Sequence, residues 1–280
     1  MRILGAMLGG TISSYNVSGT VKLGRPSFAR DYLLENFPSH GFVFPEFNTY
    51  SSEDATPYLY RDALKQIVTA AGDAHYDGIL ITHGTDTCAF FAQLAARVLT
   101  GLDIPFVITG AMRTPDADPG EAAGNLAFAV KCLGEGRTGV IFKNREGVEQ
   151  LYKAHLIMSP DISGIYSEYS DGVEPEKRDF SAFLSREVLP EILTVPAVPG
   201  ALLPEEGFDR VLICCNHSGT ARAGLAAEVE RLTAKGIQCY MAPVPTEGGV
   251  YESRKILRQA GAVELPGMPI EGAWSEVLLR

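Results

Sequence analysis

The stretch Gly78-Ile79-Leu80-Ile81-Thr82-His83-Gly84-Thr85-Asp86-Thr87 decides the fold of this 280-residue chain. Its apolar start, residues 78–81, has no polar alternation, which predicts a strand covered on both faces. Gly84 allows a sharp turn, and Thr85-Asp86-Thr87 then opens a helix whose apolar residues recur at helical spacing. Hydroxyls and a carboxylate therefore follow a buried strand, at the place where open α/β sheets bind ligands. The same residue types also suit simple helix capping.

Strands and helices alternate on both sides of this stretch. Thr56 followed by Pro57 announces a helix, because a threonine N-cap and a proline in the first turn are typical helix starts. Further strands are predicted over 2–7, 42–50, 105–109 and 138–142, and a further helix over 125–133. This alternation predicts an α/β fold with a doubly wound, mainly parallel sheet.

The strand–helix rhythm starts again after a proline-bearing stretch near residue 195. Strands are predicted over 210–215 and 238–242, and helices over 225–232, 250–259 and 270–279. We therefore expect a larger N-terminal catalytic α/β domain, 1–187, and a smaller C-terminal α/β domain, 188–280.

Composition excludes several functional classes. The chain has 24 Lys and Arg against 34 Asp and Glu, a net charge of −10, and its basic residues are scattered. We therefore expect no nucleic-acid partner. No apolar run approaches the ~18 residues of a membrane span, and the N-terminus lacks a signal-peptide pattern. The five cysteines have no CxxC spacing, which favours reduced thiols in a cytoplasmic protein over a zinc site or disulfides.

A glycine-bearing loop follows the first predicted strand. Paired Gly9 and Gly10 precede Thr11, but the order GxGxxG is absent, which disfavours a dinucleotide-binding loop. Residues 15–26 are polar and contain further glycines. They are consistent either with a mobile lid near the strand end or with an ordinary surface excursion.

Hydroxyl groups follow three predicted strands, at Thr11, Ser52 and Thr85. Ends of parallel strands meet at one sheet edge, so these side chains can converge. A threonine hydroxyl is a weak nucleophile and needs a base or proton relay, which Asp86 and Lys153 can supply as a carboxylate–amine pair. Main-chain amides near Thr85 can stabilise an oxyanion. The residues alone thus indicate acyl transfer or hydrolysis by threonine.

Three motifs in this order resemble the bacterial-type L-asparaginase/glutaminase family. They are Gly9-Gly10-Thr11-Ile12, then Thr82-His83-Gly84-Thr85-Asp86-Thr87, then Thr109-Gly110-Ala111-Met112-Arg113. Ser52-Glu53-Asp54 and Lys153-Ala154 fall where that family has a substrate-binding serine and a catalytic lysine. Similarity continues through Pro199-Gly200 and the closing segment, so the resemblance covers nearly the whole chain.

The resemblance implies hydrolysis of the side-chain amide of L-asparagine, giving L-aspartate and ammonia through a threonine acyl-enzyme. Thr11 would be the nucleophile, activated by a loop tyrosine for which Tyr15 is the candidate. Thr85, Asp86 and Lys153 would form a second group that transfers protons and activates water. The sequence leaves open which threonine attacks first.

The resemblance also implies a small amino-acid substrate, no metal and no organic cofactor. Gly10, Ser52, Glu53, Gly84 and Ala111 are the expected substrate-binding residues. Members of the family are homodimers or homotetramers, in which the neighbouring subunit completes each site. His83 is expected to be a packed, hydrogen-bonded turn residue.

Departures from the family pattern keep alternatives open. Thr220, in the stretch Asn216-His217-Ser218-Gly219-Thr220, replaces an asparagine that reaches the neighbouring site, and the second domain is short. Glu53 stands in place of an amide, which changes the charge around a ligand. A non-catalytic amino-acid sensor, an inactive paralogue, and an amidase for glutamine or another small amide are alternatives. An amidotransferase component is disfavoured, because such proteins carry an added N-terminal domain and this chain starts at its first core strand.

Overall fold

The structure, a computed structural model, describes residues 1–24 and 27–280. It comprises two compact units, residues 1–168 with 175–185, and residues 169–174 with 186–280. The end of the glycine-bearing loop predicted over 15–26, at residues 25 and 26, lies outside the described residues. No described helix is long and apolar enough to cross a membrane.

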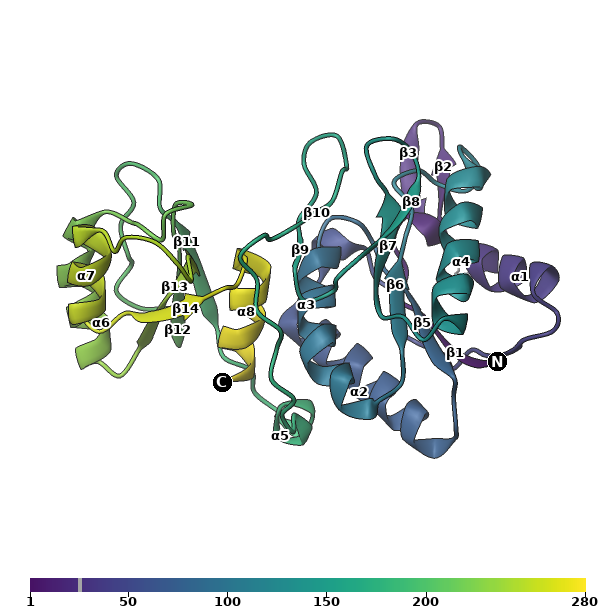
Figure 1. The fold of residues 1–280 in the computed structure, drawn as a ribbon, viewed down its shortest axis with the longest axis horizontal. Helices are drawn as coiled ribbons and strands as arrows, with labels where there is room; N and C mark the ends of the chain where they lie inside the picture. The colour runs from purple at the N-terminus through teal and green to yellow at the C-terminus, as the bar shows by residue number, and fades with distance from the viewer. Residues whose placement is uncertain (25–26) are drawn as a thin grey trace. The chain divides into compact units, whose positions relative to one another are not determined.

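A six-stranded sheet with the order β4-β1-β5-β6-β7-β8 forms the centre of the first unit (Figure 1). Its strands are β1 (Arg2–Met7), β4 (Gly41–Val43), β5 (Gly78–Thr82), β6 (Phe106–Thr109), β7 (Gly139–Lys143) and β8 (Glu149–Tyr152). Neighbouring strands are parallel except that β8 runs antiparallel to β7. A separate antiparallel pair is formed by β9 (Ile157–Met158) and β10 (Ser167–Glu168).

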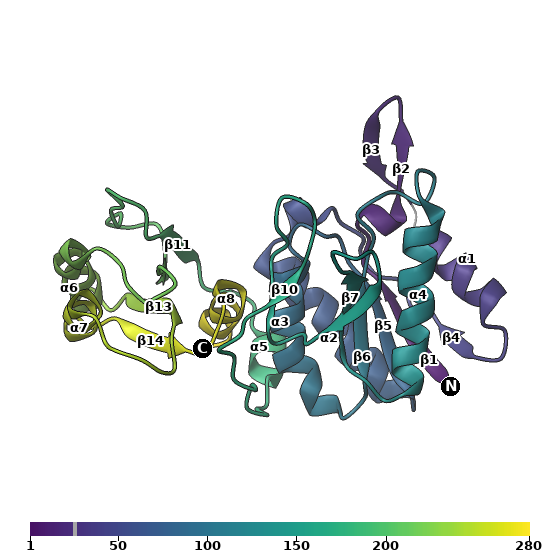
Figure 2. The ribbon, with the colours of Figure 1, turned by 45° about the horizontal axis from the view of Figure 1, so that its top comes forward.

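Helices cover both faces of this sheet. One face carries α1 (Ser27–Asn36) and α4 (Pro119–Gly134), and the other carries α2 (Pro57–Asp73) and α3 (Cys88–Val98) (Figures 1 and 2). The short helix α5 (Ser181–Ser185) packs near α2. Alternate strand residues such as Leu80 and Val107 join α1 and α4 in one core cluster. Every residue of β5 is buried, as the unbroken apolar run predicts.

Two helix starts follow from capping. The Thr56 hydroxyl accepts a hydrogen bond from the Leu59 amide at 3.2 Å, so α2 begins at Pro57 as predicted. The helix predicted over 125–133 begins earlier, at Pro119, and that predicted boundary is wrong. Asp118 caps this helix by accepting from the Glu121 amide at 3.2 Å. Residues 116–124 have the composition of a turn, so the sequence did not indicate that Asp118 caps a helix within them.

The strand predicted over 42–50 is also wrong in extent. Strand β4 covers only residues 41–43, and Tyr50 forms an isolated bridge with Gly9. Because β4 lies at the sheet edge and Pro45 has no amide hydrogen to donate, the ladder does not continue.

The glycine-bearing loop after the first strand is a β-hairpin. Strands β2 (Ser14–Val17) and β3 (Thr20–Leu23) are joined by Ser18 and Gly19, which both have positive φ angles of 53° and 82°. Such angles suit the tight two-residue turns that match strand twist. Figure 2 shows the hairpin projecting beyond the sheet. Whether it moves as a lid stays a prediction.

The second unit contains a four-stranded parallel sheet with the order β11-β12-β13-β14. Its strands are β11 (Ile192–Pro196), β12 (Arg210–Cys214), β13 (Gln238–Val244) and β14 (Val263–Pro266). Its helices are α6 (Ala226–Ala234), α7 (Glu252–Gln259) and α8 (Ile270–Leu279). Alternation sorts the β12 residues by face, since Val211 packs with α6 and α7 whereas Leu212 packs with α8.

Candidate functional site

The loops that follow β1 and β5 touch each other at two glycines. A Cβ atom built on Gly10 would lie 2.3 Å from the Cα atom of Gly84, closer than real Cβ contacts come. Gly10 also has a φ angle of +82°, where side chains are strained. Only glycine therefore allows this approach, which brings the loops carrying Thr11 and Thr85 together at one sheet edge.

Ser52 joins these loops from the segment before α2. It is buried, and its hydroxyl lies 2.4 Å from where a Cβ atom on Gly84 would be. The Ser52 hydroxyl donates to the Asp86 carboxylate at 3.4 Å and accepts from the Asp86 amide at 3.3 Å. The structure thus brings together Gly10, Ser52, Gly84 and Asp86, four of the residues predicted for the site.

Two hydroxyls support Ser52, the partly buried one of Thr87 before α3 and the buried one of Tyr60 on α2. The Thr87 hydroxyl donates to the Ser52 carbonyl at 2.8 Å and accepts from the Tyr60 hydroxyl at 2.6 Å. Burial raises the pKa of Tyr60 well above its usual value, so this hydroxyl keeps its proton and remains a donor. Sequence reasoning missed Tyr60, because its place on α2 carries no sign of this contact.

The two candidate reactive threonines differ in exposure. Thr11 is partly exposed at the start of a short 3-10 turn, whereas Thr85 is buried, with 9% of its surface exposed. Thr85 also has its main-chain carbonyl held by the Tyr166 hydroxyl at 2.7 Å. The roles of the two hydroxyls stay predictions.

His83 is a packed turn residue, as expected. Its Nδ1 atom lies 2.8 Å from the Gly84 carbonyl oxygen, which can only accept, so Nδ1 carries the proton. The ring stacks on Phe91 at 4.7 Å, and Nε2 is buried with no hydrogen-bond partner in the described structure. Burial lowers the pKa of His83 to about 4, so the ring is neutral at pH 7.

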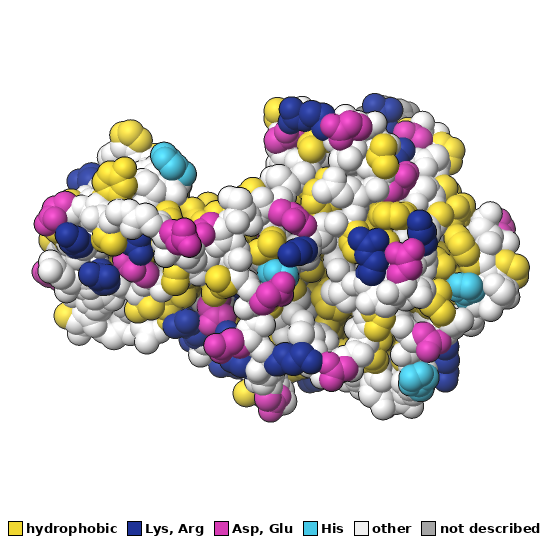
Figure 3. All heavy atoms as spheres, viewed as in Figure 1, with side chains coloured by type: hydrophobic (Ala, Val, Ile, Leu, Met, Phe, Trp, Pro, Cys, Tyr) yellow, Lys and Arg dark blue, Asp and Glu magenta, His cyan; other side chains and the backbone are white. Residues whose placement is uncertain are grey.

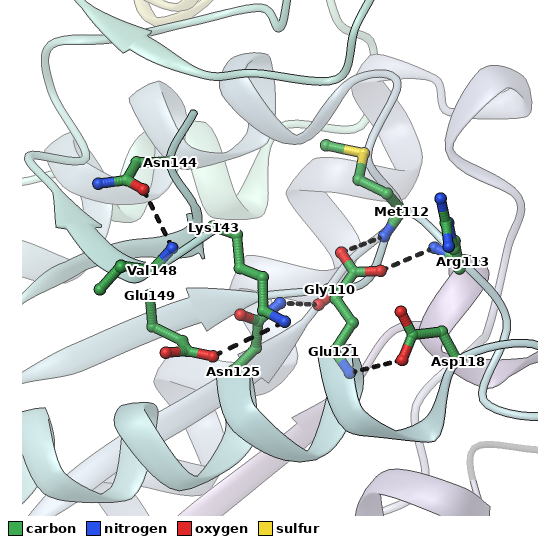
Figure 4. A network of polar contacts seen from close by, with 10 residues as sticks. All are labelled: Gly110, Met112, Arg113, Asp118, Glu121, Asn125, Lys143, Asn144, Val148 and Glu149. Carbon is green, nitrogen blue, oxygen red and sulfur yellow. Dashed lines mark hydrogen bonds and ion pairs between the residues drawn. The ribbon is translucent and has the colours of Figure 1, made fainter. Parts of the chain in front are cut away.

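A buried carboxylate fixes the loop that follows β6. Glu121, on the first turn of α4, accepts hydrogen bonds from the main-chain amides of Met112 at 2.9 Å and Arg113 at 3.1 Å (Figure 4). On the next turn of α4, Asn125 donates to the Gly110 carbonyl at 2.9 Å. Sequence reasoning missed both side chains, although the Asp118-Pro119 cap places Glu121 in the first turn.

The predicted binding residue Ala111 lies within this anchored loop and is fully buried. Because alanine has no polar side-chain atom, a polar contact of Ala111 with a ligand would have to use its main chain. Glu53 lies in a short 3-10 turn and is exposed. In the part of the chain that the structure describes, no hydrogen bond or ion pair joins the Glu53 side chain to another predicted residue.

Tyr15 and Lys153 lie on other elements. Tyr15 is on β2, 47% exposed, and its ring lies against Gly24. Lys153 is exposed and directly follows β8. Because β8 runs antiparallel to β7, the end of β8 lies beside the start of β7. Within residues 1–24 and 27–280, no hydrogen bond or ion pair of the Lys153 ammonium is formed, so its pairing with Asp86 stays a prediction.

The stretch that departs from the family pattern forms a turn after β12. The Asn216 amide donates to the Thr220 carbonyl at 2.8 Å, and the hydroxyls of Ser218 and Thr220 lie 3.1 Å apart. His217 is exposed on this turn. Among the described residues, no group of three or more His, Cys, Asp or Glu is placed to hold a metal ion.

Comparison with known proteins identifies the family. Residues 2–155 match the family described as "Asparaginase, N-terminal". A glutamyl-tRNA(Gln) amidotransferase component of Pyrococcus furiosus is 31% identical over 307 aligned positions, which cover 96% of this chain and 69% of the relative. The protein of the same name from Methanopyrus kandleri is 37% identical over 90 residues, which are 32% of this chain and only 20% of the relative.

Solved structures with a similar fold include L-asparaginases. The thermostable L-asparaginase from Thermococcus kodakarensis superimposes with a TM-score of 0.71 at 20% identity, covering 100% of this chain and 92% of the other. At that identity the likeness concerns the fold, whereas the sequence match over residues 2–155 carries the assignment. The chain belongs to the asparaginase family.

Proposed function

We propose that this protein is an amidohydrolase that converts L-asparagine to L-aspartate and ammonia through a threonine acyl-enzyme. The observation that carries the proposal is the contact between Gly10 and Gly84, which joins the loops bearing Thr11 and Thr85. A site that only bound an amino acid would not need two threonines on facing loops.

In this proposal Thr11 attacks the side-chain amide carbon, and its hydroxyl proton passes to the Tyr15 hydroxyl of the hairpin, which gives up its own proton to the amide nitrogen. The C–N bond then breaks and the protonated nitrogen leaves as ammonia. Water hydrolyses the remaining aspartyl ester with help from Thr85, Asp86 and Lys153, which restores the threonine hydroxyl. The order in which the two threonines act is left open. Main-chain amides before α3 stabilise the oxyanion, and each such donor typically lowers the barrier by roughly 3 kcal/mol.

Substrate recognition follows from the groups around Ser52. Its hydroxyl, already bound to Asp86, can contact the α-amino or carboxylate group of the amino acid. The exposed Glu53 carboxylate favours the ammonium group by direct pairing. The anchored main chain at Ala111 contacts the side-chain amide.

The resemblance implies a homodimer or homotetramer, and light scattering of the purified protein would measure the number of subunits.

A second candidate is deamidation of glutamine within an amidotransferase. The names of the two relatives described above favour it, since both are amidotransferase components, at 31% and 37% identity. The surface charge gives this second candidate less support, because a protein that works on transfer RNA is expected to have a basic patch. The net charge is −10, and Lys and Arg lie among Asp and Glu on the face seen in Figure 3.

The test is ammonia release from L-asparagine, L-glutamine and D-asparagine by the wild-type chain, Thr11→Ala and Thr85→Ala. The proposal predicts turnover of L-asparagine that both substitutions reduce by at least roughly a thousandfold. Preference for L-glutamine would favour the second candidate. A folded protein that binds L-asparagine by calorimetry but releases no ammonia would contradict the proposal and indicate a sensor.

A further inference from the structure

Lys153 follows a different kind of strand from the other residues predicted for the site. Thr11 and Thr85 follow parallel strands, whose carboxyl ends share one sheet edge. Lys153 follows β8, which is antiparallel, and its neighbour Tyr152 pairs with Val140 at the start of β7. The shared sheet edge therefore does not set the distance between Lys153 and Thr85, and another element has to do so.

Residues 166–168 form hydrogen bonds with both Thr85 and Lys153. The Tyr166 hydroxyl donates to the Thr85 carbonyl at 2.7 Å. Two residues later, the Glu168 carboxylate accepts a hydrogen bond from the Lys153 amide at 2.5 Å. The contacts span 81 and 15 residues of sequence, so a single short segment ties the loop after β5 to the end of β8.

This segment is itself held in place. The Tyr166 ring is 2% exposed and stacks on Phe142 of β7, with ring centroids 4.4 Å apart. Strand β10, which contains Glu168, pairs with β9. Gln93 of α3 holds β9 by donating a hydrogen bond to the Ile157 carbonyl at 3.0 Å. Burial raises the pKa of Tyr166 well above its usual value, so its hydroxyl stays a donor. A rigid support of this kind suits groups that must stay within fractions of an ångström of their working geometry.

We propose that Tyr166 and Glu168 are positioning residues that hold Thr85 and Lys153 in register for proton transfer. The proposal rests on the proposed function. Tyr166 acts through the main chain of Thr85, and Glu168 acts through the main chain of Lys153. Neither side chain is assigned a contact with the substrate.

The variants separate positioning from folding. Tyr166→Phe keeps the ring stacked on Phe142 and removes only the hydroxyl. Glu168→Gln keeps an oxygen that can accept from the Lys153 amide, whereas Glu168→Ala does not. Tyr152→Phe is the matched control, because Tyr152 is also buried, with its ring centroid 6.4 Å from that of Tyr166.

The experiment measures kcat and KM for L-asparagine in all variants, with thermal unfolding as the check on folding. We expect Tyr166→Phe and Glu168→Ala each to lower kcat about tenfold while KM changes by less than about twofold. Glu168→Gln and Tyr152→Phe should stay close to the wild type. A merely structural role would lower the unfolding temperature without this split.

Two results overturn the proposal in distinguishable ways. Wild-type turnover that Tyr166→Phe and Glu168→Ala leave unchanged would refute the positioning roles and leave the proposed function intact. A folded wild-type protein without turnover of L-asparagine or L-glutamine would refute the proposed function, and the positioning roles with it.

Discussion

The burial of His83 predicts that the free energy of unfolding of the chain falls in acid. Its pKa is about 4 in the folded chain, against 6.5 for an ordinary histidine, because burial penalises the charged ring. Between these values the unfolded chain binds a proton that the folded chain does not. The stability due to neutral His83 is therefore complete above pH 6.5 and is lost as pH falls through 4.

The magnitude follows from the difference of about 2.5 pKa units between 6.5 and 4. At about 1.4 kcal/mol for each unit, the folded chain loses about 3–4 kcal/mol through this one ring. That is a large share of the total stability of a typical protein, which is about 5–15 kcal/mol.

The assay is urea unfolding of the wild type and His83→Gln between pH 7.5 and about 4, a range that includes the window from 6.5 to 4 set by the two pKa values. His83→Gln should be less stable at neutral pH, since it alters a packed site, yet its stability should fall less steeply with acid. His217→Gln is the control, because His217 is exposed and should leave the wild-type slope unchanged. Equal losses in the wild type and His83→Gln would refute the reasoning.

Other substitutions test the construction of the site. Gly10→Ala should abolish turnover and destabilise the chain, whereas Gly19→Ala, at the same φ of 82° but with open space around it, should cost only about 1–2 kcal/mol of backbone strain and spare activity. Equal effects would show that the contact with Gly84 does not matter. Glu121→Leu should lower both activity and unfolding temperature, since it leaves two loop amides without their acceptor; unchanged kinetics would contradict this. Thr56→Ala should cost about 1 kcal/mol in urea unfolding with unchanged kinetics, and a neutral effect would argue against the cap.

The sequence predicts those parts of the fold that local signals determine. The apolar run of residues 78–81 and the Thr56-Pro57 cap each define an element that the structure confirms. Helix α1 was not predicted from the sequence. The strand predicted over 42–50 is too long, because the extent of an edge strand depends on the neighbour that pairs with it. The division into a catalytic domain 1–187 and a smaller domain 188–280 stays a prediction.

The site divides in the same way. The meeting of Gly10, Ser52 and Gly84 was predictable, because parallel strands end at a common edge and glycines allow close approach. Tyr60 and Tyr166 were not, since each reaches the site by a contact 27 or 81 residues away in sequence. Such contacts exist only once the sheet has formed, and no local pattern marks them.

Intact-mass spectrometry of acid-quenched enzyme would detect an acyl group carried by a threonine of this site. Wild type, Lys153→Met, Thr11→Ala and Thr85→Ala would each be quenched during reaction with L-asparagine. We expect a mass gain of one aspartyl group. The gain should be enriched in Lys153→Met, because hydrolysis of the ester is slowed, and absent from the variant that lacks the attacking threonine. The same adduct in both threonine variants, or turnover that survives both substitutions, would contradict the account.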